Sequence, residues 1–216
     1  MPAAENKIKT YFLGDACLCW SLGRSISRPA SLRVLCAYQR LKENKELAGL
    51  GVLDFVPSYT ALAVHAAPGT DWRAVRRIVD GCFASIPPDG AALTGAAVRH
   101  VLPVSYTGED LPRVAQLTGL TEEEVIERHA AAEYMVAMIG FRPHFPYLLG
   151  MDKKLMAPRL DSPRFKVPAG AVAIGGEQTG VYPEESPGGW NILGMTDPGL
   201  LKAINPGDIV IFRRTR

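Results

Sequence analysis

The first half of the chain combines short apolar runs with two longer segments that have helical spacing. Residues 27–44 place apolar side chains at positions i, i+3, i+4 and i+7, and a second amphipathic helix is predicted to begin near Asp71. The predicted strands are residues 8–13, 17–22, 52–56, 59–65 and 97–104. Two helices packed on one antiparallel sheet form an α+β domain, which we assign to residues 1–100.

Over residues 101–216 the pattern changes to short segments separated by Gly and Pro. Two short helices come first, at residues 110–117 and from Thr121, where Glu124 completes a capping box. The predicted strands are residues 134–139, 172–175, 178–182, 190–195 and 209–213. Many short strands with turn residues between them favour a β-barrel domain, with the domain boundary near residue 100.

Composition narrows the function classes only slightly. The 216 residues are 47% hydrophobic and 21% charged, with a formal net charge of +2. This near balance gives no reason to expect a nucleic-acid or membrane partner. The start lacks a signal-peptide pattern and no apolar run is long enough to span a membrane, so a cytoplasmic protein is expected. Cys17 and Cys19 are predicted to share one face of a strand as reduced thiols, because the sequence has no Cys-x-x-Cys pair.

The sequence contains no familiar catalytic motif. It lacks the G-x-x-x-x-G-K-[ST] loop, so this chain alone is not expected to bind ATP. It also lacks the G-x-S-x-G elbow of many hydrolases. The four histidines do not have the spacing of metal ligands, and no metal site is predicted. The catalytic residues are therefore unknown from motifs alone.

The segment from Gly140 to Gly194 is rich in Gly and Pro but also in aromatic residues. A disordered linker has few aromatic residues, so this segment predicts ordered loops of the kind that carry sites. Arg159 and Arg164 flank a Pro-rich loop. They can clamp a carboxylate or phosphate, and a loop-stabilising salt bridge is an equally good interpretation.

Other polar residues of this half have competing interpretations. Gln178 can orient a substrate amide or lactam, or tie loop backbone together. Tyr182, like Trp190, favours packing at the barrel rim over ligand contact. His144 can act as a general base, although a surface histidine is the favoured interpretation. Further predictions concern helix ends: Glu109 and Asp110 cap a helix, and His129 lies on a helix dipole or at a domain contact.

Three motifs in this segment, GFRPHFPYL, PRLDSPRFKVPAGAVAI and GGEQTGVYPEESPGGWNILG, are linked in one order. Together they resemble the allophanate hydrolase subunit 1 family, which includes the B subunit of bacterial 5-oxoprolinase and the kinase inhibitor KipI. The same module is part of the carboxyltransferase region of urea carboxylase. The sequence departs from the family pattern at His144, where the motif has Gly, and at Met195, where it has Arg.

The resemblance implies a cyclophilin-like β-barrel after a small α/β domain. It implies the B subunit of an ATP-dependent 5-oxoprolinase-like complex, which opens 5-oxoproline to glutamate, or of an allophanate hydrolase or carboxyltransferase-like complex. The expected partners are a homologous C subunit, together with a larger A subunit, and ATP is used by the complex. The alternative partner is a histidine kinase, inhibited by a KipI-like protein. Within this framework the residues expected to contact substrate are Arg159, Arg164, Gln178, Tyr182 and His144.

Overall fold

The structure is a computed structural model that describes residues 8–90 and 97–215. Its internal contacts divide the chain into two compact units, Met1–Ala96 and Ala97–Arg216. The division lies close to the boundary that we placed near residue 100. Each unit has its own hydrophobic core and is described by itself.

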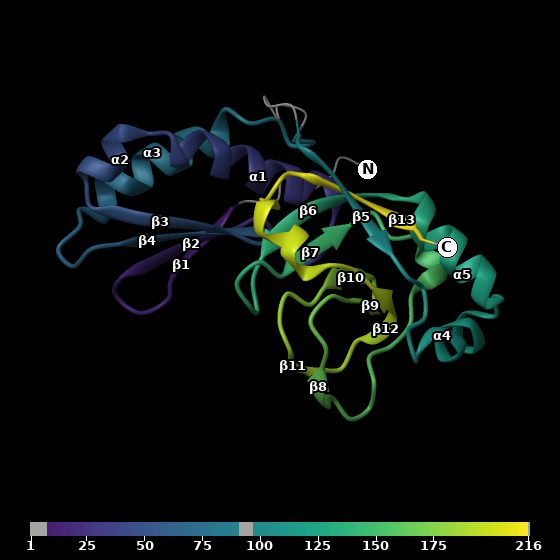
Figure 1. Ribbon diagram of the computed structural model, residues 1–216. Coiled ribbons are helices and arrows are strands. Elements are labelled where there is room, and N and C mark those ends of the chain that lie inside the picture. Colours follow the sequence, from purple (N-terminus) through teal and green to yellow (C-terminus); the bar gives the residue numbers. More distant parts are fainter. Residues whose placement is uncertain (1–7, 91–96, 216) are drawn as a thin grey trace. The chain divides into compact units, whose positions relative to one another are not determined.

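The first unit packs helices on one face of an antiparallel sheet with strand order β1-β2-β4-β3. In Figure 1, α1 and α3 lie side by side along this sheet. Leu18 and Trp20 of β2 face the helices in the core, and the indole N–H of Trp20 donates to Asp80 of α3 at 2.6 Å. The elements are β1 (Lys9–Phe12), β2 (Cys17–Ser21), α1 (Arg28–Lys42), α2 (Lys45–Gly49), β3 (Val52–Pro57), β4 (Ala61–Ala66) and α3 (Trp72–Ala84).

Two details of this unit bear on the sequence predictions. Cys17 and Cys19 share a face of β2, as predicted, with their Sγ atoms 4.0 Å apart. That separation is far longer than the ~2.05 Å of a disulfide bond. The short helix α2 was not predicted: Asn44 accepts hydrogen bonds from the backbone N–H groups of Glu46 and Leu47 and so begins a new helix after α1.

The second unit is built on a seven-stranded sheet with the order β12-β9-β10-β7-β6-β13-β5. The backbone N–H and C=O groups of Ser105, just after β5, pair with those of Met195 in β12 at 2.9 Å, which links the two ends of the sheet. The α+β unit followed by a barrel-like unit confirms the predicted fold class. The strands are β5 (Arg99–Val104), β6 (Glu133–Ile139), β7 (Pro146–Leu149), β8 (Arg164–Val167), β9 (Ala171–Gly175), β10 (Gln178–Val181), β11 (Ser186–Gly188), β12 (Asn191–Met195) and β13 (Ile209–Arg214).

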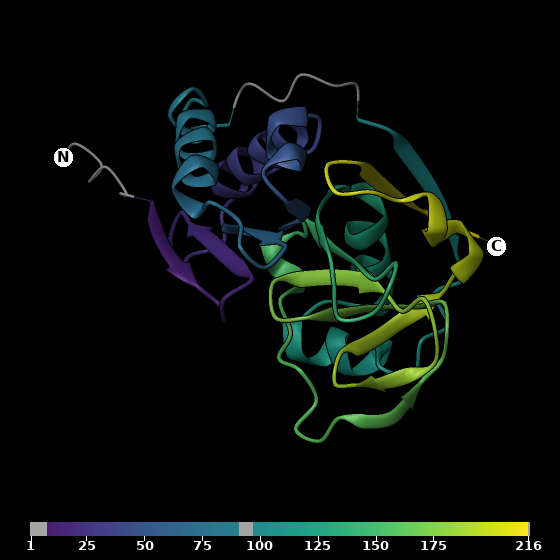
Figure 2. The same cartoon turned by 90° about the vertical axis from the view of Figure 1, so that its left-hand side faces the viewer.

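The helices of this unit come before and between those strands. They are α4 (Leu111–Thr118), α5 (Glu122–Ala131), and the 3-10 helices η1 (Lys153–Leu155) and η2 (Pro198–Ala203). Strands β8 and β11 form a separate two-stranded ribbon, which lies at the lower end of this unit in both Figure 1 and Figure 2. The predicted capping box of Thr121 and Glu124 is present at the start of α5.

One predicted strand belongs to the other unit. We counted residues 97–104 with the first sheet, but β5 pairs in parallel with β13 in the barrel. Periodicity identifies a strand, but it does not identify the partner strand, which here lies about a hundred residues further along the chain. Strand β7 was missed because Pro146 and three residues after it give too short a signal.

The strands β9, β10 and β12 separate two hydrophobic clusters. Val172, Ile174 and Leu193 belong to the larger cluster, together with residues of α4, α5 and β13. Ala171 and Ala173 alternate with them along β9 and belong to the smaller cluster, which is rich in aromatic rings. We call the first cluster the barrel core and the second the aromatic cluster. The candidate site lies in the aromatic cluster.

Candidate functional site in the aromatic cluster

Four aromatic side chains from three segments meet in this cluster, with Phe145 and Tyr147 both in or next to β7. The ring of Phe145 is central: its centroid lies 4.9 Å from Tyr147, 5.1 Å from Tyr182 and 5.7 Å from Trp190. Most of these contacts are edge-to-face, an arrangement favoured by the ring quadrupoles. The rings surround a cavity of about 120 Å³. Its lining residues are Phe141, Phe145, Tyr147, Arg159, Tyr182, Pro187, Gly188, Gly189 and Trp190.

Two glycines make this arrangement possible. A Cβ atom at Gly188 would lie 2.2 Å from the hydroxyl oxygen of Tyr182, and one at Gly175 would lie 2.6 Å from the indole ring of Trp190. Neither distance can be accommodated without moving a buried ring. The absence of a Cβ atom at these glycines therefore allows the rings to pack directly against the backbone.

Arg159 supplies the positive charge of the pocket. Its guanidinium lies over the Trp190 ring, 5.8 Å from the centroid, in a cation–π contact. The backbone N–H of the next residue, Leu160, donates to the carbonyl oxygen of Gly189 at 2.7 Å and fixes the segment beside the pocket. Among the described residues no carboxylate pairs with Arg159. The pocket thus offers a cation without a counter-charge beside an aromatic surface.

The two tyrosines supply neutral hydrogen-bonding groups. Burial raises the pKa of Tyr182, and burial likewise raises the pKa of Tyr147. Both side chains are therefore phenols at neutral pH. The cavity combines one guanidinium, two phenols and flat ring faces, which suits a small planar polar group that carries a negative charge.

The rim of the pocket contains strained backbone. Phe141 has φ 67° and its exposed ring meets Phe145 edge-to-face, with centroids 5.6 Å apart. His144 also has φ 67°, in the left-handed region that glycine favours. The family motif has Gly at this position, so the loop keeps its glycine-type conformation although the residue is histidine. Backbone strain of this kind gathers at ligand sites.

The structure divides the predicted site residues. Arg159 and Tyr182 line the aromatic pocket. His144 is exposed on the rim loop and does not line the pocket. Gln178 stands at the start of β10, paired with Gly175 across the β9–β10 hairpin, and does not line it either.

Arg164 is held by carboxylates rather than directed into the pocket. It contacts Glu109 at 2.9 Å and the buried Asp110 at 2.8 Å, which is the salt-bridge interpretation. Asp110 is the N-cap residue of α4, as predicted. Its carboxylate accepts from Arg164 and from the backbone N–H of Ile192 at 2.7 Å, and it makes no side-chain capping bond to α4. The tertiary partners satisfy it more fully than the helix end would.

His129 lies in the last turn of α5, as predicted, but as a buried neutral ring rather than as a charge on the helix dipole. Its side chain is fully buried in the barrel core and stacks on Phe212, with centroids 4.7 Å apart. Nε2 lies 2.9 Å from the hydroxyl of Thr179, and Nδ1 lies 2.8 Å from the hydroxyl of Tyr106. Thr179 donates to the carbonyl oxygen of Ala173, so Nε2 carries the proton and Nδ1 accepts from Tyr106. Burial lowers the pKa of His129 to about 3, so the ring is neutral.

Phe141 and Tyr147 were not predicted to line the pocket, and Trp190 was predicted to serve packing. The available signal was the repeated placement of aromatic residues between Gly and Pro along residues 140–194. Two negative findings complete the description. Within residues 8–90 and 97–215, no group of three or more His, Cys, Asp or Glu is arranged to hold a metal ion. Nor does any helix of this described part combine the length and apolar character needed to cross a membrane.

The comparison with family models assigns this two-unit fold to the carboxyltransferase-type domains. The model "Carboxyltransferase domain, subdomain C and D" matches residues 8–204. The chain belongs to this family.

Curated relatives agree with this assignment. The chain is 36% identical to the B subunit of 5-oxoprolinase from Bacillus subtilis over 94% of this chain and 90% of that protein. It is 46% identical to the B subunit of 5-oxoprolinase from Escherichia coli O157:H7 over 51% of this chain and 56% of that protein. A shorter match, to a putative urea carboxylase of Emericella nidulans, is 33% identical over 44% of this chain and 8% of that protein.

Solved structures show the same fold. The protein TTHA0988 is 35% identical and superposes with a TM-score of 0.77 over 93% of this chain and 40% of that chain. Kluyveromyces lactis urea carboxylase has a TM-score of 0.73 at 14% identity, over 97% of this chain and 22% of that chain, and so is similar in fold alone. The two units described here therefore also occur as parts of much longer proteins.

Proposed function

We propose that the chain is the B-type subunit of a 5-oxoprolinase-like complex, in which ATP is used to open the lactam 5-oxoproline to glutamate. The support is the similarity to a protein named as the B subunit of 5-oxoprolinase along nearly the whole of both chains. The expected partners are a homologous C subunit, together with a larger A subunit, and ATP chemistry is assigned to the complex. A cytoplasmic location fits this role. The relatives reported above are named for 5-oxoprolinase and urea carboxylase, so inhibition of a histidine kinase is not proposed.

The aromatic pocket is proposed to receive the lactam. At about 120 Å³ the cavity is below the roughly 300–1,000 Å³ of ordinary ligand pockets, so it suits one small ring rather than a nucleotide. A lactam is planar at its amide and can stack on the ring of Trp190. Arg159, which has no carboxylate partner among the described residues, then pairs with the carboxylate of the substrate. The phenols of Tyr147 and Tyr182 can donate to the lactam carbonyl oxygen.

In this arrangement the pocket residues bind and orient. A phenol that donates to the carbonyl oxygen withdraws electron density from the amide, which makes the amide carbon more electrophilic. The aromatic walls exclude water from the stacked face. The remaining predicted substrate residues, Arg164, Gln178 and His144, have no proposed contact with the lactam. The single observation that carries the site is the guanidinium of Arg159 over the Trp190 ring, without a carboxylate partner in the described part of the chain.

The test uses the complex assembled with the presumed partner subunits. ATP-dependent formation of glutamate from 5-oxoproline is measured for the wild type and for Arg159→Gln. Since a hydrogen bond to a charged group contributes about 1.5–3 kcal/mol, kcat/KM is expected to fall about 10- to 150-fold. Arg159→Lys retains the charge without the planar fork and is expected to recover part of the loss.

Arg213→Gln is the matched control, because Arg213 is exposed on the same unit and does not line the pocket. It should leave kcat/KM within about twofold. Absence of glutamate formation in a verified wild-type complex would refute the function. Equal activity of Arg159→Gln and wild type would refute the site while leaving the function intact.

A further inference from the structure

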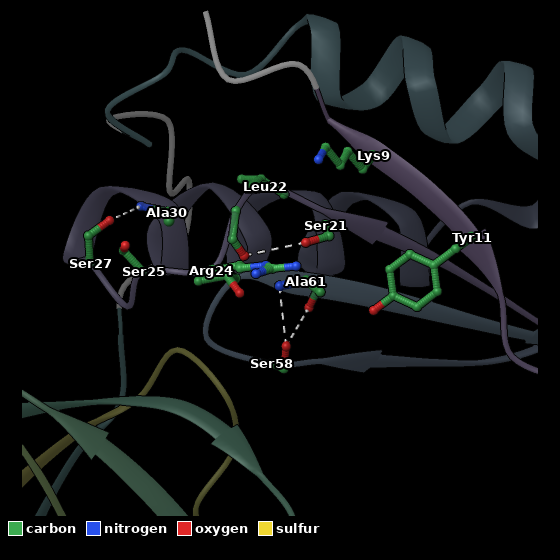
Figure 3. Close-up of a pocket in the computed structure, with 12 residues that line it drawn as sticks. Lys9, Tyr11, Ser21, Leu22, Arg24, Ser25, Ser27, Ala30, Ser58 and Ala61 are labelled. Carbon is green, nitrogen blue, oxygen red and sulfur yellow. Dashed lines mark hydrogen bonds between the residues drawn. The ribbon is translucent and has the colours of Figure 1, made fainter. Parts of the chain in front are cut away.

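We propose that the first unit carries a second site, which binds a phosphorylated small molecule at the end of its sheet. The site is a cavity of about 840 Å³ where three segments meet: strand β1, the loop between β2 and α1, and the turn between β3 and β4 (Figure 3). This volume lies within the roughly 300–1,000 Å³ typical of small-molecule pockets. The proposal does not rest on the proposed function, because the pocket belongs wholly to residues of the first unit.

The charge of the pocket is one-sided. Lys9 and Arg24 both line it, and among the described residues no Asp or Glu does. Neither cation forms an ion pair within the part of the chain that the structure describes. In Figure 3, Arg24 lies between Ser21 and Ser58, and Lys9 extends from the beginning of β1. Two cations beside one cavity without a counter-charge favour an anionic ligand.

The lining is also rich in hydroxyl groups. They belong to Tyr11, Ser21, Ser25, Ser27, Ser58 and Thr60. The Ser58 hydroxyl is occupied by both backbone groups of Ala61, at 3.1 and 3.2 Å. The Ser27 oxygen accepts from the backbone N–H of Ala30, so its own proton is still available to a ligand. The Ser21 hydroxyl donates to the carbonyl oxygen of Gly23 at 3.4 Å, so Ser21 and Ser58 are engaged within the protein whereas Ser27 still has a proton to donate.

The helix α1 adds to the positive field. It begins at Arg28, directly after Ser27, and has no acidic residue in its first turn. The partial positive charge of its N-terminus is thus not neutralised by its own side chains. Ala30, in this first turn, lines the pocket. The helix end adds to the attraction that Lys9 and Arg24 exert on an anion, and its contribution is the smaller one.

The number and spread of donors select a phosphoryl group over a carboxylate. A phosphoryl group presents three strong acceptor oxygens and up to two negative charges, whereas a carboxylate presents two oxygens in one plane and one charge. Two cations and hydroxyls on three separate segments surround the cavity, so a tetrahedral dianion can use more of them at once. The space beyond one phosphoryl group leaves room for the rest of a small metabolite.

The test measures binding of inorganic pyrophosphate to the purified full-length chain by isothermal titration calorimetry at low salt, with succinate as the carboxylate probe. Saturable pyrophosphate binding is expected, with succinate at least about tenfold weaker. The double variant Lys9→Gln/Arg24→Gln should bind pyrophosphate at least about 30-fold more weakly. Both side chains are exposed, so the variant should fold, which an unchanged thermal unfolding midpoint verifies.

Arg77→Gln is the matched control, since Arg77 is exposed on α3 and does not line the pocket. It should bind pyrophosphate like the wild type, as should Arg159→Gln in the other unit. The proposal is overturned if the wild type shows no saturable pyrophosphate binding, if succinate binds as tightly, or if the double variant binds as well as Arg77→Gln. None of these results depends on lactam hydrolysis.

Discussion

The two faces of the barrel strands differ in how their polar side chains are partnered: His129 is buried, whereas Arg159 is exposed. Toward the barrel core, His129 satisfies both ring nitrogens with the hydroxyls of Tyr106 and Thr179. Toward the aromatic cluster, Arg159 has a ring beneath it but no carboxylate partner among the described residues. A satisfied buried network serves the fold, whereas a cation without a counter-charge beside a cavity is available to a ligand. The barrel core thus holds a fully partnered polar side chain, and the aromatic cluster one that has no carboxylate partner among the described residues.

The side chains on the two faces of these strands also differ in size. Along β9, Val172 and Ile174 fill the barrel core, while Ala171 and Ala173 face the aromatic cluster. Small residues on the second face leave space for rings that come from neighbouring segments. A strand with bulky residues on one face and Ala or Gly on the other therefore indicates where large side chains from elsewhere lie against the sheet.

The largest expected effect contrasts two phenylalanines of the barrel unit. Phe212 is 1% exposed and stacks on His129, whereas Phe165 of β8 is 93% exposed. Phe212→Ala should lower the free energy of unfolding by about 3–5 kcal/mol through lost burial and a residual cavity. Phe165→Ala should change it by less than about 0.5 kcal/mol. Urea denaturation of the isolated chain measures both, and similar losses for the two variants would contradict the contrast.

The next largest expected effect is a pH dependence of the unfolding free energy, caused by the buried His129. Folding lowers the pKa of His129 from 6.5 to about 3, so below pH 6.5 the unfolded chain binds a proton that the native chain does not. The native state is therefore favoured most above pH 6.5. Its stability should fall by up to about 1.4 kcal/mol per pH unit as pH decreases from 6.5 toward 3.

His129→Gln isolates this contribution, because other titrating groups act equally in both proteins. The difference in unfolding free energy between wild type and variant should shrink as pH decreases, since the variant cannot take up that proton in the unfolded state. Denaturation series at several pH values provide the measurement. His100→Gln is the control, because His100 is only partly buried and lies 2.9 Å from the carboxylate of Asp208. A parallel pH profile for wild type and His129→Gln would exclude the neutral buried histidine.

Features that depend on residues close together in the sequence could be predicted, and features that depend on distant residues could not. The capping box at Thr121 needs only two residues three positions apart, and it was predicted correctly. The shared face of Cys17 and Cys19 needs only strand alternation. In contrast, Asp110 and Ile192 meet across 82 positions, and His129 meets Thr179 across 50. No local pattern contains those pairings, so the helix positions of Asp110 and His129 could be predicted but their side-chain partners could not.

The candidate site shows the same limit. Arg159 and Arg164 have similar sequence surroundings, and both were candidates for binding an anion. The structure separates them because Arg164 meets Glu109 and Asp110, residues more than fifty positions away. Aromatic residues within a Gly- and Pro-rich segment indicated an ordered site. They did not indicate which rings would surround the cavity.

The smallest expected effect concerns the rim loop, where a histidine adopts a backbone conformation that favours glycine. His144 adopts φ 67°, which costs a non-glycine residue roughly 1 kcal/mol or more. His144→Gly should therefore raise the free energy of unfolding, by up to about 1 kcal/mol after the greater flexibility of glycine in the unfolded chain is subtracted. His144→Ala retains a Cβ atom in the same conformation and should give no gain. Urea denaturation distinguishes the two variants: a gain with alanine equal to that with glycine would show that the imidazole, rather than the backbone conformation, is the source of the strain.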